Sequence, residues 1–216
     1  MRIEAHGLGK RFGPRRWIVR DFSHDFAPGS RTAVAGPNGS GKSTLLRMLC
    51  GQLLPSAGDV RFRESVAGHA PRDIPADRLY RRTALSAPYV ELVEELSGEE
   101  AVRLHARMRG FRQNLGAEDL WARVGWKRSV RRQPVSTYSS GMRQRLTLLL
   151  ALATEADAVF LDEPTSYLDA EGVAWFGRLL ADWTDARTLV IASNEPRDFA
   201  ACTTRIDAEA WLPAPR

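Results

Sequence analysis

The sequence lacks the features of a membrane-spanning or secreted protein. No apolar run approaches the roughly 18 residues that a membrane helix needs, and the stretch Met1–Gly7 has no apolar region like that of a signal peptide. Cysteine is scarce, since Cys50 and Cys202 are the two thiols, and neither belongs to a Cys-x-x-Cys pair or a histidine cluster. We therefore expect a cytosolic chain with two buried thiols and without a zinc or redox site.

Lysine is also rare, because only Lys10, Lys42 and Lys127 occur among the 31 basic residues. The net charge of +5 is therefore carried almost entirely by arginine. A basic surface for nucleic acid or anionic lipid is one interpretation. The arginine clusters are not interleaved with aromatic residues as base stacking would require, so we expect no nucleic-acid partner.

What the sequence does contain is a phosphate-binding loop. Residues 36–44 fit the pattern G-x-x-x-x-G-K-[ST], between a β-leaning segment, residues 31–35, and a helix-forming segment, residues 45–50. Glycines let the backbone curl around a polyphosphate, while exposed N–H groups and a helix N-terminus attract the anion. The predicted nucleotide-binding residues are Gly36, Pro37, Asn38, Gly39, Ser40, Gly41, Lys42, Ser43 and Thr44. Lys42 would contact the β- and γ-phosphates, and the Ser43 hydroxyl would bind Mg²⁺.

Two acidic residues follow a second apolar segment. Val159, Phe160 and Leu161 lead directly into Asp162 and Glu163. An acid at the carboxyl end of a buried strand beside a phosphate loop typically binds Mg²⁺, which we assign to Asp162. The next acid, Glu163, can then orient and deprotonate the attacking water.

The rest of the chain predicts an α/β fold: a P-loop NTPase (RecA-like) core with an N-terminal antiparallel β subdomain and a helical insert. Strands are expected within 1–35 and at 60–63, 83–88, 157–163 and 188–192, with a loop at 64–79 and a tail at 211–216. Ser97 and Glu100 form a predicted capping box that begins a helix. We expect a single domain over 1–216, with a core of about 1–86 and 155–216 and an insert of about 87–154.

These motifs, in this order, make the sequence similar to the ATP-binding subunit of an ABC (ATP-binding cassette) transporter. Tyr138–Met142 stands where that family has its LSGGQ signature, and Tyr167–Asp169 matches its D-loop. The resemblance implies a head-to-tail homodimer or pseudo-dimer that binds two ATP molecules with Mg²⁺. Each γ-phosphate would be contacted in trans by Ser139, Ser140 and Gly141. Phe12 matches the aromatic residue that stacks on adenine, although a core position is an equal alternative.

The family's coupling partner is an integral membrane permease, here expected to be a separate polypeptide that holds this chain at the inner face of the cell membrane. The segment of about 88–96 would form the contact surface, or would simply pack within the protein. A soluble ATPase that serves as an assembly factor or slow nucleotide switch, without transport, is the alternative.

Three positions depart from the family pattern. The segment Ser86–Glu91 has no glutamine for Mg²⁺ and water, where Tyr89 or Glu91 is a possible substitute. Asn194 occupies the place of the switch histidine and would contact the γ-phosphate without carrying a charge. The signature has Ser140 in place of a glycine and ends in Met142. Glu163 and Asn194 are thus the predicted catalytic residues, with turnover that is slow or depends on a partner.

Overall fold

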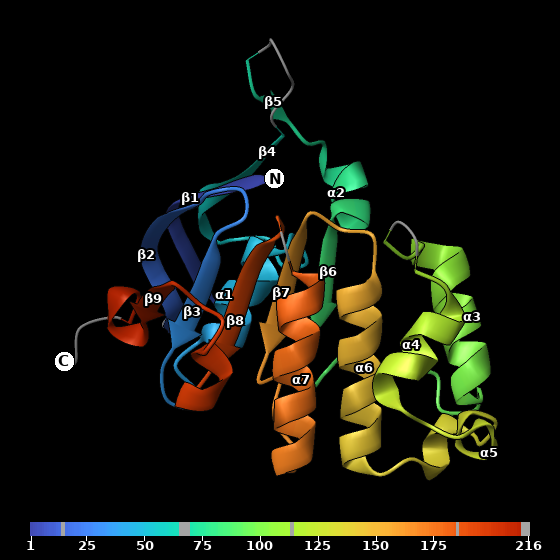
Figure 1. Cartoon of the computed structure of the whole chain (residues 1–216). Helices are drawn as coiled ribbons and strands as arrows, with labels where there is room; N and C mark the ends of the chain where they lie inside the picture. Colours follow the sequence, from blue (N-terminus) through green and yellow to red (C-terminus); the bar gives the residue numbers. More distant parts are fainter. Residues whose placement is uncertain (14–15, 65–69, 113–114, 185, 213–216) are drawn as a thin grey trace.

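Two sheets form the centre of the molecule, whose computed structural model describes residues 1–13, 16–64, 70–112, 115–184 and 186–212 (Figure 1). The first sheet is antiparallel and has the order β2 (Trp17–Phe26), β1 (Arg2–Arg11), β4 (Ala57–Glu64), β5 (Arg72–Asp73). The second is parallel and has the order β6 (Thr83–Ser86), β7 (Ala158–Asp162), β8 (Thr188–Ser193), β3 (Arg31–Ala35), β9 (Thr204–Asp207). The predicted α/β fold class is confirmed.

The burial of each strand follows from its sequence pattern. Every residue of β7 and β8 is buried, as expected for apolar strands covered on both faces of a parallel sheet. In β2, by contrast, Val19, Phe22 and Phe26 are buried between exposed neighbours, so one face packs inward. Helix α1 (Lys42–Leu49) packs between the two sheets, where its leucines meet Phe26 and Phe160 in one hydrophobic cluster.

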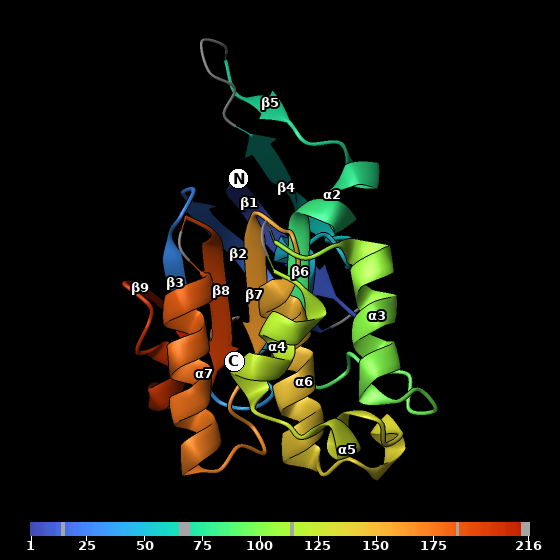
Figure 2. The ribbon, with the colours of Figure 1, turned by 45° about the vertical axis from the view of Figure 1, so that its right-hand side comes forward.

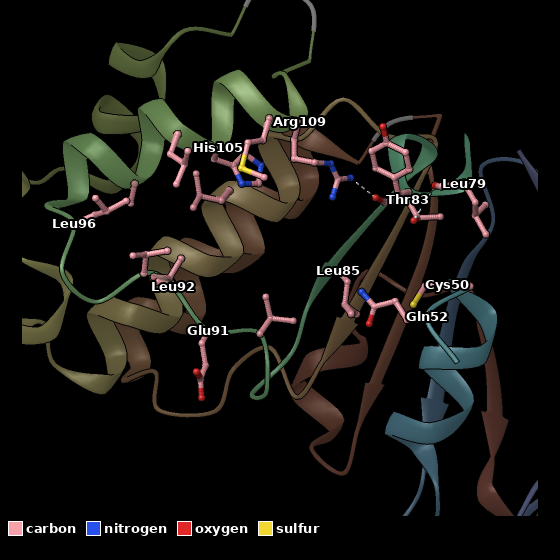
Figure 3. A pocket seen from close by; sticks show the side chains of 18 of the residues that line it. Cys50, Gln52, Leu79, Thr83, Leu85, Glu91, Leu92, Leu96, His105 and Arg109 are labelled. Atoms are coloured by element: carbon pink, nitrogen blue, oxygen red, sulfur yellow. Dashed lines mark hydrogen bonds between the residues drawn. The ribbon is translucent and has the colours of Figure 1, made fainter. Parts of the chain in front are cut away.

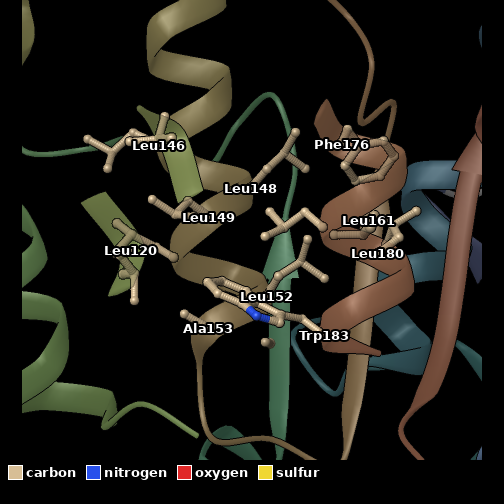
Figure 4. Packing of buried hydrophobic residues seen from close by; sticks show 14 of the residues in the cluster. Leu120, Leu146, Leu148, Leu149, Leu152, Ala153, Leu161, Phe176, Leu180 and Trp183 are labelled. Carbon is tan, nitrogen blue, oxygen red and sulfur yellow. The ribbon is translucent and has the colours of Figure 1, made fainter. Parts of the chain in front are cut away.

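Helices α6 (Ser140–Ala153) and α7 (Ala170–Trp183) lie over the other face of the parallel sheet (Figure 1). Beyond α6 lie α3 (Gly98–Arg109), α4 (Ala117–Val124) and α5 (Arg128–Arg131), of which α3 and α4 contact α6 and α5 contacts α3. Figure 4 shows that α6 lies between α4 and α7, with Leu120 on one side and Phe176 and Leu180 on the other. The predicted capping box starts α3: the Ser97 hydroxyl accepts from the Glu100 N–H at 3.3 Å, and Glu100 Oε2 accepts from the Ser97 N–H at 2.8 Å. Within the described residues, no helix is both long enough and apolar enough to cross a bilayer.

A buried cation joins the ends of α6 and α7. Arg187, only 6% exposed, donates to the carbonyl of Leu152 at 2.9 Å and to the carbonyl of Trp183. Carbonyls at a helix C-terminus lack helical partners and carry partial negative charge, so a guanidinium satisfies two helix ends at once. Desolvation lowers the pKa of Arg187 to about 9.

Cys50 is buried as expected, whereas Cys202, also expected to be buried, is partly exposed. Two expectations about segments of the chain were wrong as well. The segment 64–79 is not simply a loop, because it contains β5 and the start of α2 (Ala76–Arg82), which both views place at the upper end of the molecule (Figures 1 and 2). Helix α2 forms because Leu79 is buried against Gly51 at the end of α1. The segment that begins at Trp211 is not simply a tail either, since Trp211 is 1% exposed and packs edge-on against Phe22. Residues 213–216 lie outside the described part of the chain.

A candidate site for nucleotide binding and hydrolysis

The predicted site residues converge on one edge of the parallel sheet. Strands β7, β8 and β3 are neighbours, and their carboxyl ends lead to Asp162, to Ser193 and to the phosphate loop. Ligands of open parallel sheets bind at this edge, because the loops there come from several strands. Figure 1 places the N-terminal end of α6, which carries the predicted signature, at the same lower edge.

The phosphate loop has the backbone that its glycines predict. Gly39 and Gly41 have φ angles of 80° and 90°, in the region that residues with a side chain rarely adopt. A Cβ on Gly41 would lie 2.9 Å from the carbonyl oxygen of Ile18, so a larger residue would force the loop from β2. The buried Lys42 side chain crosses under the loop and donates to the carbonyls of Gly36 at 2.9 Å and Pro37 at 3.2 Å. Its ammonium is therefore held where a phosphate in the loop would meet it.

The C-terminal segment supports the same loop, which the sequence did not predict. The Trp211 indole N–H donates to the Ser40 carbonyl at 2.8 Å, and the Trp211 carbonyl accepts from the Arg20 N–H at 2.9 Å. A Cβ on Gly36 would lie only 2.6 Å from that of Ala208, so the turn before Trp211 also touches the loop. No local pattern marks these residues as part of the site, because more than 160 positions separate them from Ser40.

The two acids after β7 have different surroundings. Glu163 adopts a positive φ of 48°, which directs its carboxylate between two groups: Lys42 Nζ lies 3.3 Å from Oε1, and Ser193 Oγ donates to Oε2 at 2.9 Å. Asp162 is 1% exposed, and its Oδ1 atom has no hydrogen-bond partner in the described part of the chain. Burial raises the pKa of Asp162, and a hydrogen bond from Ser43 partly opposes that shift.

This donor set fits Mg²⁺. A buried, unpartnered carboxylate oxygen of Asp162 beside the Ser43 hydroxyl offers hard oxygen ligands. The described residues contain no group of three or more His, Cys, Asp or Glu side chains that could hold a metal by themselves. Mg²⁺ suits such a sparse site because it usually keeps several waters and binds substrate phosphates as well as one or two protein groups.

The predicted signature begins a helix. Ser139 is the N-cap of α6, where its hydroxyl accepts from the Met142 N–H at 3.2 Å. Ser140 is exposed, whereas Tyr138 is buried and donates its hydroxyl to the Val130 carbonyl at 2.9 Å. Because Ser139 and Ser140 are both exposed, an anion from another molecule can approach this first turn. Binding by Ser139, Ser140 and Gly141 remains a prediction.

Three further positions stand at the margins of the site. Phe12 is 57% exposed, so it is not a core residue, and Lys10 Nζ lies 5.5 Å from its ring centre. Asn194 is exposed at the end of β8. Tyr89 lies under the Arg47 guanidinium at 5.2 Å, and its pKa is raised by burial and by the charge of Asp162. Tyr89 thus lies within the electrostatic reach of the proposed Mg²⁺ ligand.

Comparison with known proteins agrees with this geometry. Residues 19–166 match the ABC transporter family. The chain belongs to that family. It is 36% identical to the daunorubicin resistance ATP-binding protein DrrA3 of Streptomyces coeruleorubidus, over 87% of this chain and 56% of that protein. It is 32% identical to the energy-dependent translational throttle protein EttA of Escherichia coli K12, over 90% of this chain and 38% of that protein.

Solved cassettes share the fold. The dimeric bacterial ABC transporter cassette MJ0796 superimposes with a TM-score of 0.78 at 19% identity, covering 95% of this chain and 93% of that one. A bacterial Atm1-family exporter solved with ATP bound gives 0.75 at 17% identity, covering 95% of this chain and 36% of that one. The cassette therefore has the family's architecture, while it spans less than two thirds of the curated relatives described above.

Proposed function

We propose that this cassette is the ATP-hydrolysing subunit of an ABC transporter, which binds MgATP, dimerises and drives a separate membrane permease. The observation that carries this proposal is the pairing of the phosphate loop with Glu163, whose carboxylate lies between Lys42 and Ser193. A carboxylate held beside the loop is placed to take a proton from a water that attacks the γ-phosphate. Asp162 and Ser43 would hold Mg²⁺, which supplies charge neutralisation to the phosphates.

In the proposed dimer, a second copy would complete each nucleotide site with donors to the γ-phosphate. The N-terminal turn of α6 exposes Ser139 and Ser140, while Gly141 lies against the backbone of Tyr167. In a head-to-tail pair this turn would close over the partner's nucleotide, with Asn194 contacting the γ-phosphate and Phe12 the base. Because ATP would lie between two copies, its binding stabilises the dimer by mass action and its hydrolysis releases the dimer.

An apolar groove beside the site supports a membrane partner. It has a volume of about 450 Å³ and lies between the end of α1, helix α2, the segment 90–96 and helix α3. Figure 3 shows Leu92 and Leu96 on one side of it and Leu79 on the other. Val93 and Met108, which also line the groove, are 50% and 70% exposed. Apolar grooves of this kind accept amphipathic helices, and we assign this one to a cytoplasmic helix of the permease.

The membrane assignment is tested by charging the groove. Val93→Asp and Met108→Asp should abolish co-purification with the membrane chain that accompanies the wild-type cassette, and should leave the ATPase activity of the isolated cassette within about twofold, because neither residue contacts the site. Leu54→Asp is the matched control, since Leu54 is 83% exposed and does not line the groove. Equal membrane binding by all variants would refute the assignment.

A soluble role is the second candidate, favoured by the 32% identity to EttA. On that account the cassette is an assembly factor or slow nucleotide switch without transport. Fractionation of cells that express the Glu163→Gln variant distinguishes the two accounts. The transporter proposal expects the cassette in the membrane fraction with its permease, at the inner face. Recovery with ribosomes or other soluble particles would favour the alternative.

A further inference from the structure

A buried carboxyl group behind Glu163 has no part in the site described so far. Asp198 belongs to the short 3₁₀ helix Pro196–Phe199 and is 2% exposed. Neither of its carboxyl oxygens has a hydrogen-bond partner among the residues that the structure describes. Burying an ionised carboxylate without a partner is very costly, so this group requires an explanation.

The nearest polar groups connect Asp198 to the proposed base. The hydroxyls of Ser193 and Thr165 face its carboxyl group. The Thr165 hydroxyl accepts from Arg197 Nε at 3.1 Å. The Ser193 hydroxyl donates to Glu163 Oε2 at 2.9 Å and accepts from the Glu195 N–H at 3.0 Å. Ser193 thus contacts Glu163 and also faces Asp198.

The hydrogen bonds of the Ser193 hydroxyl constrain the protonation state of Asp198. A hydroxyl has one proton and two lone pairs. The proton is used on Glu163 and one lone pair on the Glu195 N–H, which leaves one lone pair for a donor. An ionised Asp198 can only accept, and would compete with Glu163 for the single proton, whereas a neutral Asp198 can donate to the remaining lone pair.

The electrostatic surroundings favour the neutral form. Burial raises the pKa of Asp198, and the negative charge of Glu163 acts in the same direction, while the facing hydroxyls of Ser193 and Thr165 and the charge of Arg197 oppose that shift. Arg197 directs its Nε to Thr165, and its own side chain is half exposed. The guanidinium therefore does not replace the missing partner of the carboxyl group.

We propose that Asp198 is a positioning residue: as a neutral acid it donates to Ser193 Oγ and so keeps the Ser193 hydroxyl directed at Glu163. The proposal rests on the function proposed above, with Glu163 as the base. During hydrolysis the oxygen of the attacking water would bond to the γ-phosphorus and the bond to the leaving oxygen of the β-phosphate would break, while a proton of that water goes to Glu163; the Asp198 proton is not consumed. Its contribution is to fix the orientation of the Glu163 carboxylate, which proton transfer requires.

Single-turnover hydrolysis of MgATP and nucleotide affinity, measured on the full chain, test this proposal. Loss of one such contact corresponds to about tenfold in rate, so Asp198→Ala should slow hydrolysis by that factor with an unchanged dissociation constant for ATP. Asp198→Asn should restore the rate to within about threefold of the wild type, because an amide can still donate to Ser193. The double variant Asp198→Ala, Ser193→Ala should be no slower than Ser193→Ala alone, since both act through one contact. Asp59→Ala, an exposed acid on β4, is the control.

Each alternative gives a different result. If Asp198→Asn is as slow as Asp198→Ala, the group must ionise or accept, and the neutral-donor assignment is overturned. A wild-type rate in Asp198→Ala, additive effects with Ser193→Ala, or a loss of ATP affinity that accounts for the slower rate would also overturn it. Thermal melting identifies a variant that fails to fold, and the isosteric Asp198→Asn keeps the test decisive in that case. Equal hydrolysis by the wild type and Glu163→Gln would instead refute the proposed function itself.

Discussion

Two loops flank Glu163, and they are built in opposite ways. On one side the phosphate loop holds Lys42, whose ammonium lies 3.3 Å from the carboxylate and is fixed by backbone carbonyls. On the other side, at the end of β8, the Ser193 hydroxyl donates to the same carboxylate at 2.9 Å, next to the buried side chain of Asp198. The first loop keeps its family's pattern, while the second lacks the family's histidine.

This difference between the two loops predicts separate roles, nucleotide binding for the phosphate loop and the rate of hydrolysis for the end of β8. Backbone N–H groups and a lysine can bind any polyphosphate, so the phosphate loop tolerates little change and is recognisable in one short stretch. On the proposed function, the end of β8 and the loop after it would act on the transition state through the orientation of Glu163 and the donor at Asn194. We therefore expect changes in the first loop to alter nucleotide affinity and changes in the second to alter the rate of hydrolysis.

The largest effect is expected at the residue between the two loops. Glu163→Gln should lower the single-turnover rate by about 10²- to 10⁴-fold, because the amide cannot accept the proton of the attacking water. ATP affinity should stay within a few-fold, and the variant should accumulate as a dimer in saturating MgATP. Light scattering after size exclusion measures the dimer, with MgADP as the control. Equal rates in variant and wild type would remove Glu163 as the base.

Lys42→Ala tests the expectation that a change in the phosphate loop alters nucleotide affinity. Removing a charge-assisted contact to phosphate costs about 1.5–3 kcal/mol, so ATP affinity should fall by roughly 10- to 150-fold. Titration with a fluorescent ATP analogue measures the loss. Lys127→Ala, which removes an exposed lysine just before α5, should leave affinity within a few-fold. Unchanged affinity in Lys42→Ala would mean that nucleotide does not occupy this loop.

The chemistry of the site was predictable from sequence wherever it is local. The phosphate loop and the acids after β7 each occupy a few adjacent residues whose pattern follows from their chemistry. The confirmed capping box at Ser97 is another such case. Fold class followed as well, because the apolar runs of β7 and β8 are typical of buried parallel strands.

What sequence could not supply depends on contacts between distant segments. Trp211 meets Ser40 across 171 positions, so a residue that seemed part of a tail supports the phosphate loop. Leu79 forms part of α2 because it is buried against the end of α1, within a segment whose polar composition predicted a loop. The buried position of Asp198 behind Ser193 likewise results from folding, since a lone aspartate after Pro-Arg is unremarkable in sequence.

Trp211→Phe tests whether the contact of Trp211 with the phosphate loop affects nucleotide affinity. The substitution keeps an aromatic ring against Phe22 but leaves the buried Ser40 carbonyl without its 2.8 Å donor. A buried group left unpaired costs about 1–3 kcal/mol, so ATP affinity should fall roughly tenfold. Trp17→Phe, at a half-buried tryptophan at the start of β2, is the matched control. An altered single-turnover rate with normal affinity would mean that Trp211 affects the rate of hydrolysis and not nucleotide binding.

The smallest effect is expected at Asn194, where a histidine would restore the residue of the family pattern in the loop after β8. A protonated histidine donates a charge-assisted hydrogen bond where the amide donates a neutral one, a gain of about 1 kcal/mol or roughly fivefold in rate. Asn194→His should therefore raise single-turnover hydrolysis by that factor, most clearly below pH 6.5, where imidazole is charged. Asn194→Ala separates the causes, since it should be slower than the wild type if the amide donates to phosphate. A slower Asn194→His would show that the amide has a role of its own, and that the loop after β8 has adapted to it.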